Sequence, residues 1–461
     1  MYNIHHAHTT YSLHDSAQSP EELVLKAKEL GIKNVTITDH GTMLGVDDFM
    51  KAGEKYDVNT IPGVEIYMED LSHLVLVAKN LEGYKSISFA LREANENQAK
   101  IRKLVYPRMK TETILKYLAN NKNIIVSSAC INGPLGKILL RRQKIEKEIK
   151  KKQEQIVLMQ AFHTDWVSAT SSYNSYADEE KKLKQEKKEY KIYTKPAFTK
   201  KIAKDASLRD TYNYAITQLE KIELELKQAA KYRKYYKKKS DELKSKGIKY
   251  EKLKKEIENI VLPNPDDLYY EAKKKAEEYK KLFPHFFIEL QYHFMPEEEY
   301  VMKQLFQIAT ELDIPLIAAN DAHMASVGDE TARQILRYNY FECHQLISEA
   351  DKELYVKSEA ELRNTLSHIL PLDAVNEAIK NTSILEECHV KFEKNNHYPK
   401  CNSDKTIQEL ASVKIEELKR KGMWTQEHDE RYKQEMDTIY QMGFVDYHMV
   451  VQDYCRMIRI L

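Results

Sequence analysis

The sequence lacks the features that define several large classes of protein. Only 12 of its 461 residues are glycine, and it contains neither a P-loop nor a G-x-G-x-x-G segment, so we expect no glycine-rich loop that cradles a nucleotide. No run approaches the roughly 18 apolar residues that a membrane-spanning helix needs. Residues 1–11 are rich in histidine and lack the apolar stretch of a signal peptide. The five cysteines show no paired spacing, which indicates reduced thiols in a cytoplasmic protein rather than a disulfide framework.

Charge is balanced overall but is divided unevenly along the chain. The formal net charge is +1, yet residues 141–260 carry 32 Lys and Arg against 19 Asp and Glu, whereas the remainder carries 40 against 52. We expect a basic, coiled-coil-like helical insertion over residues 141–265, with polar breaks near Ser168–Ser175 and Lys195–Pro196. The insertion could be a solvated arm, a surface that contacts phosphate backbones, or a binding site for a partner protein. Its tyrosines Tyr232, Tyr235 and Tyr236 could stack on bases or pack within the hairpin.

Short β-rich runs alternate with helical patterns on both sides of this insertion. The expected strands are Ile4–His8, Val35–Asp39, Thr60–Glu65, Leu74–Val77, Ile124–Ser128, Phe287–Gln291 and Leu316–Ala319. Ser19 as N-cap, Pro20 at the first helical position and Gly31 beyond the end predict a first helix, and Pro296 begins a similar pattern. Repeated βα units predict an α/β fold, a distorted (β/α)7 barrel followed by a mostly helical segment.

Residues of metal-ligating type stand at the ends of nearly all of these expected strands. His6 and His8 share one face of the first strand because alternate residues of a strand point the same way, and Asp321 and His323 repeat this spacing after the last strand. The others are His40, Glu65, His73 and Cys130 at intervening strand ends, with Asp15 in the loop after the first strand. Strand ends of a βα barrel converge on one mouth. Unrelated core histidines and surface acids would explain one or two of these residues, but not the series.

The chemistry of this set favours a cluster of ions. Five imidazoles, three carboxylates and one thiolate are too many ligands for one ion and suit two or three. Imidazole and thiolate favour Zn or Fe, whereas carboxylates and water suit Mn. Such a cluster activates water near neutral pH and holds the oxygens of a phosphoester.

Other histidines and cysteines receive no ligand role. His5 is expected to be packed or exposed, and His14 lies outside the set. The pairs Cys343-His344 and Cys388-His389 lack the C-x2-C partner of a zinc site. We expect Cys388 in the core, on a helix face with Ile384 and Leu385, and assign no role to Cys401 and Cys455.

Several segments, in order along the chain, resemble the PHP (polymerase and histidinol phosphatase) domain of bacterial replicative polymerases. They are His6–Ser12, Thr38–Gly41, Pro62–Tyr67 and His73–Asn80. The stretches His73–Tyr84, Phe287–His293 and Ile314–His323 resemble the DNA polymerase III alpha branch more than the free phosphatases, and Glu435–Asp453 resembles the segment that opens the polymerase palm. The chain therefore resembles the N-terminal part of a bacterial-type, including phage-encoded, DNA polymerase III alpha subunit, although the basic insertion has no recognised counterpart.

The resemblance implies a function and a set of site residues. The metal ligands would be His6, His8, Asp15, His40, Glu65, His73, Cys130, Asp321 and His323, with His8, Asp15, Glu65 and Asp321 serving catalysis. It implies two or three divalent ions (Zn, Mn or Fe), DNA and other replisome subunits as partners, and a phosphoesterase acting as a 3′–5′ exonuclease within a nucleotidyltransferase family. Two alternatives are a non-catalytic, metal-stabilised scaffold of a split polymerase and a small-molecule phosphatase or pyrophosphatase.

The resemblance also sets the expected domains. They are a PHP domain over 1–330 interrupted by the insertion 141–265, a helical connector over 331–430, and the start of the palm over 431–461. The family's P-D-x-D-x-D aspartates and its Gly/Ser-rich nucleotide loop are absent, so we expect no polymerisation by this polypeptide alone. The apolar pattern of Val450–Leu461 ends without a helix terminator, which favours a missing continuation, such as the second half of a split polymerase.

Overall fold

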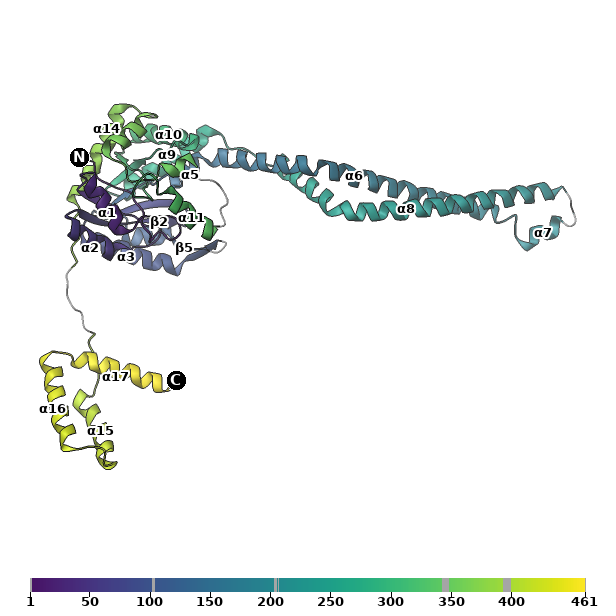
Figure 1. Cartoon of the computed structure of the whole chain (residues 1–461). Coiled ribbons are helices and arrows are strands. Elements are labelled where there is room, and N and C mark those ends of the chain that lie inside the picture. Colours follow the sequence, from purple (N-terminus) through teal and green to yellow (C-terminus); the bar gives the residue numbers. More distant parts are fainter. Residues whose placement is uncertain are drawn as a thin grey trace. The chain divides into compact units, whose positions relative to one another are not determined.

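The computed structural model describes residues 2–101, 104–202, 205, 207–341, 348–392 and 399–460. The chain forms two compact units, Met1–Val390 and Lys391–Leu461. The first unit contains a β-sheet surrounded by helices and a long helical hairpin, and the second unit contains three helices (Figure 1). The pair Cys343-His344 lies outside the described residues.

The sheet of the first unit closes into a barrel. Its strands are β1 (Asn34–Ile37), β2 (Asn59–Met68), β3 (His73–Ala78), β6 (Ile124–Ser127), β7 (Phe286–Leu290) and β8 (Leu316–Ala318). The extended N-terminal segment closes the ring, because Ile4 bridges Val35 on one side and Ala7 bridges Ala322 on the other. Six strands and the N-terminal segment therefore surround one core, which confirms the expected α/β barrel class.

One strand of the barrel is antiparallel to both of its neighbours. β3 pairs antiparallel with both β2 and β6, whereas β1–β2, β6–β7 and β7–β8 are parallel. The amino end of β3 therefore lies at the mouth of the barrel, where the parallel strands have their carboxyl ends. His73, the first residue of β3, reaches that mouth for this reason.

Helices with marked ends cover the barrel. α1 (Pro20–Glu29) begins with the predicted capping box between Ser19 and Glu22, and Gly31 follows its end at φ +73°. The others are α2 (Val46–Tyr56), α3 (Leu81–Glu96), α4 (Thr111–Tyr117), α5 (Pro134–Leu139), α9 (Pro265–Leu282) and α10 (Pro296–Leu312). Their apolar faces bury the barrel core; on α10, Val301, Met302 and Leu305 are at most 1% exposed.

Two details of the expected sheet are wrong. Residues Ile4–His8 form isolated bridges rather than a strand, because side chains take over part of the backbone pairing: the Ala7 N–H donates to Thr38 Oγ1 at 3.0 Å. The hairpin of β4 (Gln98–Ile101) and β5 (Leu104–Met109) was not expected. β5 pairs with the end of β2, and its residues form part of a pocket wall.

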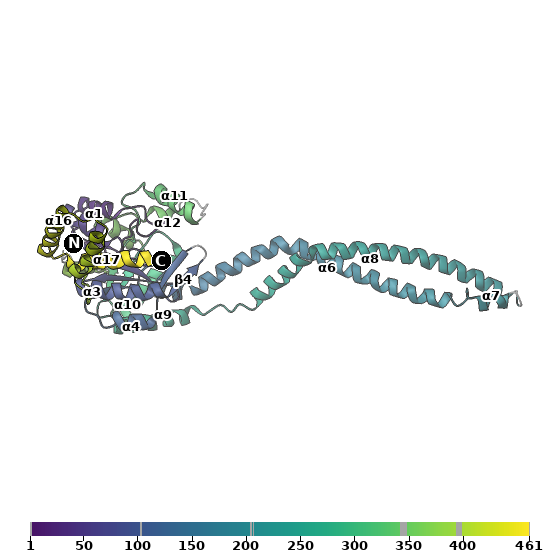
Figure 2. The ribbon, with the colours of Figure 1, turned by 90° about the horizontal axis from the view of Figure 1, so that it is seen from below.

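The basic segment forms an antiparallel hairpin of α6 (Arg141–Tyr190) and α8 (Leu208–Glu258), with α7 (Pro196–Ile202) near its tip (Figure 2). Helix α6 continues through Ser168–Ser175, so the break predicted there is wrong. Small side chains let the helices approach: Ala169 is buried, and the Thr170 and Ser240 hydroxyls lie 2.8 Å apart. The chain does leave the helix before Pro196, as predicted.

Shorter helices complete the two units. In the first unit they are α11 (Glu330–Phe341), α12 (Glu349–Lys352), α13 (Glu359–Ser367), α14 (Leu372–Asn381) and the 3-10 helix Thr382–Glu387. Cys388 packs in the core beside Leu385, as expected. The second unit has α15 (Ile407–Arg420), α16 (Gln426–Gln441) and α17 (Val445–Ile460), with the predicted turn at Gly443, φ +70°. Among the described helices, none has the length and apolarity to span a membrane.

Candidate metal centre

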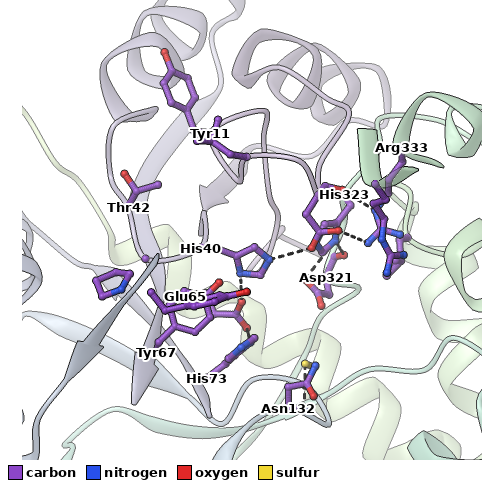
Figure 3. Close-up of a pocket in the computed structure, with 18 of the residues that line it drawn as sticks. Tyr11, His40, Thr42, Glu65, Tyr67, His73, Asn132, Asp321, His323 and Arg333 are labelled. Atoms are coloured by element: carbon purple, nitrogen blue, oxygen red, sulfur yellow. Dashed lines mark hydrogen bonds and ion pairs between the residues drawn. The ribbon is translucent and has the colours of Figure 1, made fainter. Parts of the chain in front are cut away.

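A pocket of about 1200 Å³ opens at the mouth of the barrel (Figure 3). Its lining includes seven of the nine predicted ligands, namely Asp15, His40, Glu65, His73, Cys130, Asp321 and His323. The other two, His6 and His8, lie directly beneath it and contact Asp321. The structure therefore brings all nine predicted side chains to one end of the barrel.

The deepest group joins the N-terminal segment to the loop after β8. His6 Nε2 and His8 Nε2 lie 3.0 Å apart, and Asp321 Oδ1 lies 3.2 Å and 3.0 Å from them, respectively. Asp321 adopts φ +49°, a left-handed conformation that is uncommon outside glycine, at the point where its carboxylate turns toward these imidazoles. Two ring nitrogens and a carboxylate oxygen thus converge on one point.

Glu65 connects a second group. Its Oε2 lies 2.7 Å from His40 Nδ1 and its Oε1 lies 3.1 Å from His73 Nδ1. The same carboxylate is 3.7 Å from His6 Nε2 and 3.8 Å from His8 Nε2. Glu65 therefore stands between the deep group and the outer histidines, where its carboxylate would help to hold metal ions at both.

Asp15 completes the rim on the opposite side. Its Oδ2 lies 3.3 Å from His40 Nε2 and 3.5 Å from His323 Nε2. Its other oxygen accepts a 2.7 Å hydrogen bond from Arg333 of α11, and the Arg333 Nε donates to the Asp15 carbonyl at 2.7 Å. Arg333 also pairs with Asp351 at 2.6 Å. The carboxylate of Asp15 is therefore held from α11 while it faces the histidines.

Hydrogen bonds at Nδ1 orient three of the histidines. Glu289, an acceptor when ionised, lies 2.7 Å from His6 Nδ1, and the Asp321 carbonyl lies 2.7 Å from His323 Nδ1. His8 Nδ1 lies 2.9 Å from Ser12 Oγ, whose single proton is donated to Asp39 at 2.7 Å. Each Nδ1 must therefore carry the proton, and each Nε2 presents a lone pair to the pocket, as in histidines that bind metals.

The electrostatics of the site call for a cation. Burial acts against ionisation of Glu65 and Asp321, but neighbouring histidines outweigh it and hold both pKa values below their usual range. Burial and the charges of His40 and His323 lower the pKa of His8 to about 3. Burial also opposes protonation of His6, yet Asp321 and Glu289 raise its pKa to about 10. Glu65 and Asp321 are therefore ionised and His8 is neutral near pH 7, which are the protonation states that metal ligands require.

Three ligand groups fit metal ions by position and by donor type. In each, one nitrogen or oxygen from every member lies within 4.8 Å of the others; the groups are His6–His8–Asp321, His8–His40–His323 and His40–Glu65–His73. The buried atoms Glu65 Oε1 and Asp321 Oδ1 accept no hydrogen bond from the described residues, although ring nitrogens lie 3.0–3.2 Å from them. A cation between these atoms would satisfy both oxygens. The residues present therefore fit a cluster of divalent ions.

Cys130 and Asp15 stand outside these three groups. Cys130 is buried and lines the pocket, and burial together with the charges of Asp321 and Glu65 raises the pKa of its thiol well above the usual value. Asp15 contacts the group of His40 and His323 through its Oδ2. Their role as ligands stays a prediction.

The sequence did not identify the residues that form hydrogen bonds to the ligand side chains on the side away from the pocket. Glu289 accepts from Ser127 Oγ at 2.5 Å, and His5 Nε2 lies 2.9 Å from the same hydroxyl, so His5 is packed inside the barrel. Asp39 accepts from Thr9 and Ser12. A glutamate within an apolar strand is a detectable signal, because unpaired buried carboxylates are rare. Arg333 gave no comparable signal, since it lies in an ordinary amphipathic helix.

Comparison with known proteins places this geometry in a family context. Residues 5–165 match the family described as PHP domain. A DNA polymerase III subunit alpha of Helicobacter pylori is 37% identical over 140 residues, which cover 28% of this chain and 11% of the relative. The subunit alpha of Borreliella burgdorferi is 31% identical over 156 residues, covering 29% and 12%, respectively. That of Treponema pallidum is 22% identical and covers 97% of this chain and 29% of the relative.

One solved structure overlaps with the chain over a short segment. A candidate metal-dependent phosphoesterase from Bifidobacterium adolescentis is 30% identical over 20% of this chain and 33% of its own, with a TM-score of 0.16. This overlap is too small to support a structural argument. The chain spans less than a third of the length of the curated relatives named above. With a PHP match over residues 5–165 and one relative aligned along nearly all of its residues, this chain is homologous to the bacterial DNA polymerase III alpha subunits.

Proposed function

We propose that this chain is the N-terminal part of a replicative DNA polymerase III alpha subunit whose PHP site hydrolyses phosphodiesters as a 3′–5′ exonuclease. The observation that supports this proposal most is the convergence of three ligand groups, which share His8 and His40, at one open pocket. When bound, two or three divalent ions (Zn, Mn or Fe) would activate water and hold the phosphate oxygens.

The chain's own residues would prepare the site for a DNA end. Glu289, Ser12 and the Asp321 carbonyl hold His6, His8 and His323 with Nε2 toward the pocket. Arg333 fixes Asp15 at the rim. The pocket volume of about 1200 Å³ exceeds the roughly 300–1,000 Å³ typical of small-ligand sites, so a terminal nucleotide with its phosphodiester can enter.

Other pocket residues suit the remaining parts of a nucleotide. Arg92 of α3 lines the pocket, and its guanidinium suits a phosphate. Tyr67 and Tyr106 make an edge-to-face pair at 5.0 Å between ring centres, and both line the pocket. An aromatic surface of this kind can stack on a base whatever its sequence, as an exonuclease requires.

The proposal is tested by digestion of a primer labelled at its 3′ end. We expect the purified chain with Mn²⁺ to release labelled nucleotide. The double variant His8→Ala/Asp321→Ala should lose roughly 100-fold or more in rate, because it removes two ligands and disrupts two of the three ligand groups. The matched control is His368→Ala, an exposed histidine at the end of α13 that is not among the residues lining the pocket. Release by the double variant at the wild-type rate would contradict the assignment of the site.

The same assay separates the alternatives. Metal binding that raises the melting temperature without hydrolysis of any phosphoester would indicate a structural scaffold, whereas phosphate release from monoesters but not from DNA would indicate a small-molecule phosphatase. The assignments of 331–430 as a connector and 431–461 as the start of a palm stay predictions. Because no P-D-x-D-x-D segment occurs, polymerisation is not proposed for this polypeptide alone.

A further inference from the structure

The outer face of α8 carries an uninterrupted row of positive charge. Between Glu225 and Asp241 the helix has no acidic residue, although it has seven Lys and Arg. Lys227, Lys231, Lys234 and Lys238 are spaced by four, three and four residues, so they lie along one face of the helix. All four are exposed. We call these four residues the lysine stripe.

The lysine stripe faces away from the partner helix. The side of α8 that packs on α6 is marked by buried Ala229, by Tyr236, which stacks on Tyr176 at 5.8 Å, and by Arg233, which pairs with Glu180 at 3.1 Å. Tyr236 and Tyr232 both stack on Tyr176, so these tyrosines pack within the hairpin. Tyr235 differs, because it is 59% exposed and lies four residues after Lys231 on the face of the stripe.

Ion pairing separates the stripe from one set of lysines elsewhere in the hairpin. Lys152, Lys184 and Lys187 pair with glutamates at 2.9, 2.5 and 2.5 Å, and Lys252 lies 3.9 Å from Glu256. Within the described residues, Lys227, Lys231 and Lys234 form no ion pair, and Lys238 has only Glu242 at 3.9 Å. Like charges one helical turn apart destabilise a helix. A bound anionic partner would offset this repulsion.

We propose that the lysine stripe binds the phosphate backbone of duplex DNA without reading its sequence. The stripe is about 16 Å long at 1.5 Å per residue, a length over which a duplex presents about ten phosphate charges at one per roughly 1.7 Å. Two paired helices, each about 10 Å across, are broader than the major groove of about 12 Å. The lysines therefore reach phosphates and not base edges, while Tyr235 packs on sugar. This proposal goes beyond the exonuclease and does not depend on it.

The test measures binding of the full chain to a 20-base-pair duplex by fluorescence anisotropy, across a series of salt concentrations, with EDTA present. EDTA keeps ions out of the barrel site, so a failed exonuclease proposal would leave this result unaffected. The logarithm of the affinity falls linearly with the logarithm of the salt concentration, and each lysine–phosphate contact makes this slope steeper by about 0.9. Changing all four stripe lysines to Gln should therefore reduce the slope by about 3 to 4.

Two control variants carry the comparison. The first control variant has Gln in place of Lys152, Lys184, Lys187 and Lys252. It loses the same charge as the stripe variant, but from paired positions, and its slope should change by less than about 1. Arginine at all four stripe positions keeps the charge and should retain the full slope, and helix content by circular dichroism checks the fold of each variant. Equal slopes for the stripe and control variants, or an unchanged slope for both, would overturn the proposal. Affinity for an acidic protein with none for DNA would also overturn it.

Discussion

At the scale of single residues, the account depends on where the imidazole protons lie. Three histidines direct Nδ1 at fixed acceptors and Nε2 at the pocket, so the site is prepared for cations by groups that do not bind them. The sequence identified the histidines, because their spacing at strand ends is visible in one dimension. It did not identify Ser12 or Glu289 in their supporting roles, because those depend on the direction of single hydrogen bonds.

Ser12 provides the sharpest test of this orientation. Its hydroxyl accepts a hydrogen bond from His8 Nδ1 and donates one to Asp39. The substitution Ser12→Ala should therefore let the His8 ring rotate or change tautomer. We expect metal affinity to fall by about 10–100-fold, measured by competition with a chelating dye. Ser86→Ala removes a half-buried hydroxyl that donates to the Glu82 carbonyl of its own helix, away from the pocket lining, and should leave the affinity unchanged. An unaltered affinity for the Ser12 variant would show that the hydroxyl does not orient His8.

At the scale of elements, hydrophobic alternation located six barrel strands, but it could not show their direction. The antiparallel course of β3 follows from the short turn between β2 and β3, and it brings His73 to the mouth by its amino end. The β4–β5 hairpin was not predicted, since its residues alternate weakly and face the pocket rather than the core. The break predicted at Ser168–Ser175 failed because tertiary packing outweighs the low helix propensity of serine.

Close packing of the hairpin predicts an unusual response to a helix-favouring substitution. Gly247 of α8 packs against Trp166, and a Cβ there would lie 2.2 Å from the indole ring. Alanine normally stabilises a helix by about 1 kcal/mol relative to glycine, but overpacking here should cost about 1–3 kcal/mol. We therefore expect Gly247→Ala to accelerate trypsin cleavage within the hairpin, whereas Ser245→Ala, two residues earlier on an exposed position, should not. Slower cleavage of the Gly247 variant would mean that the helices are not packed at this point.

At the scale of the whole molecule, one barrel gathers ligands from residues as distant in sequence as His6 and His323, with the hairpin between them. The α/β class and the set of candidate ligands could be predicted because a barrel converts strand order into a ring of strand ends. The pocket wall and the Arg333 contact could not be predicted, because they depend on how α11 and β5 pack on that ring.

The most direct measurement of the central claim is the number of metal ions per chain, determined by elemental analysis after equilibration with Mn²⁺ or Zn²⁺ and removal of excess. The account predicts two or three ions per chain, and a loss of at least one ion in His8→Ala/Asp321→Ala, which disrupts two of the three ligand groups. Absence of bound metal in the folded wild-type chain, or the same number of ions in the variant, would contradict it.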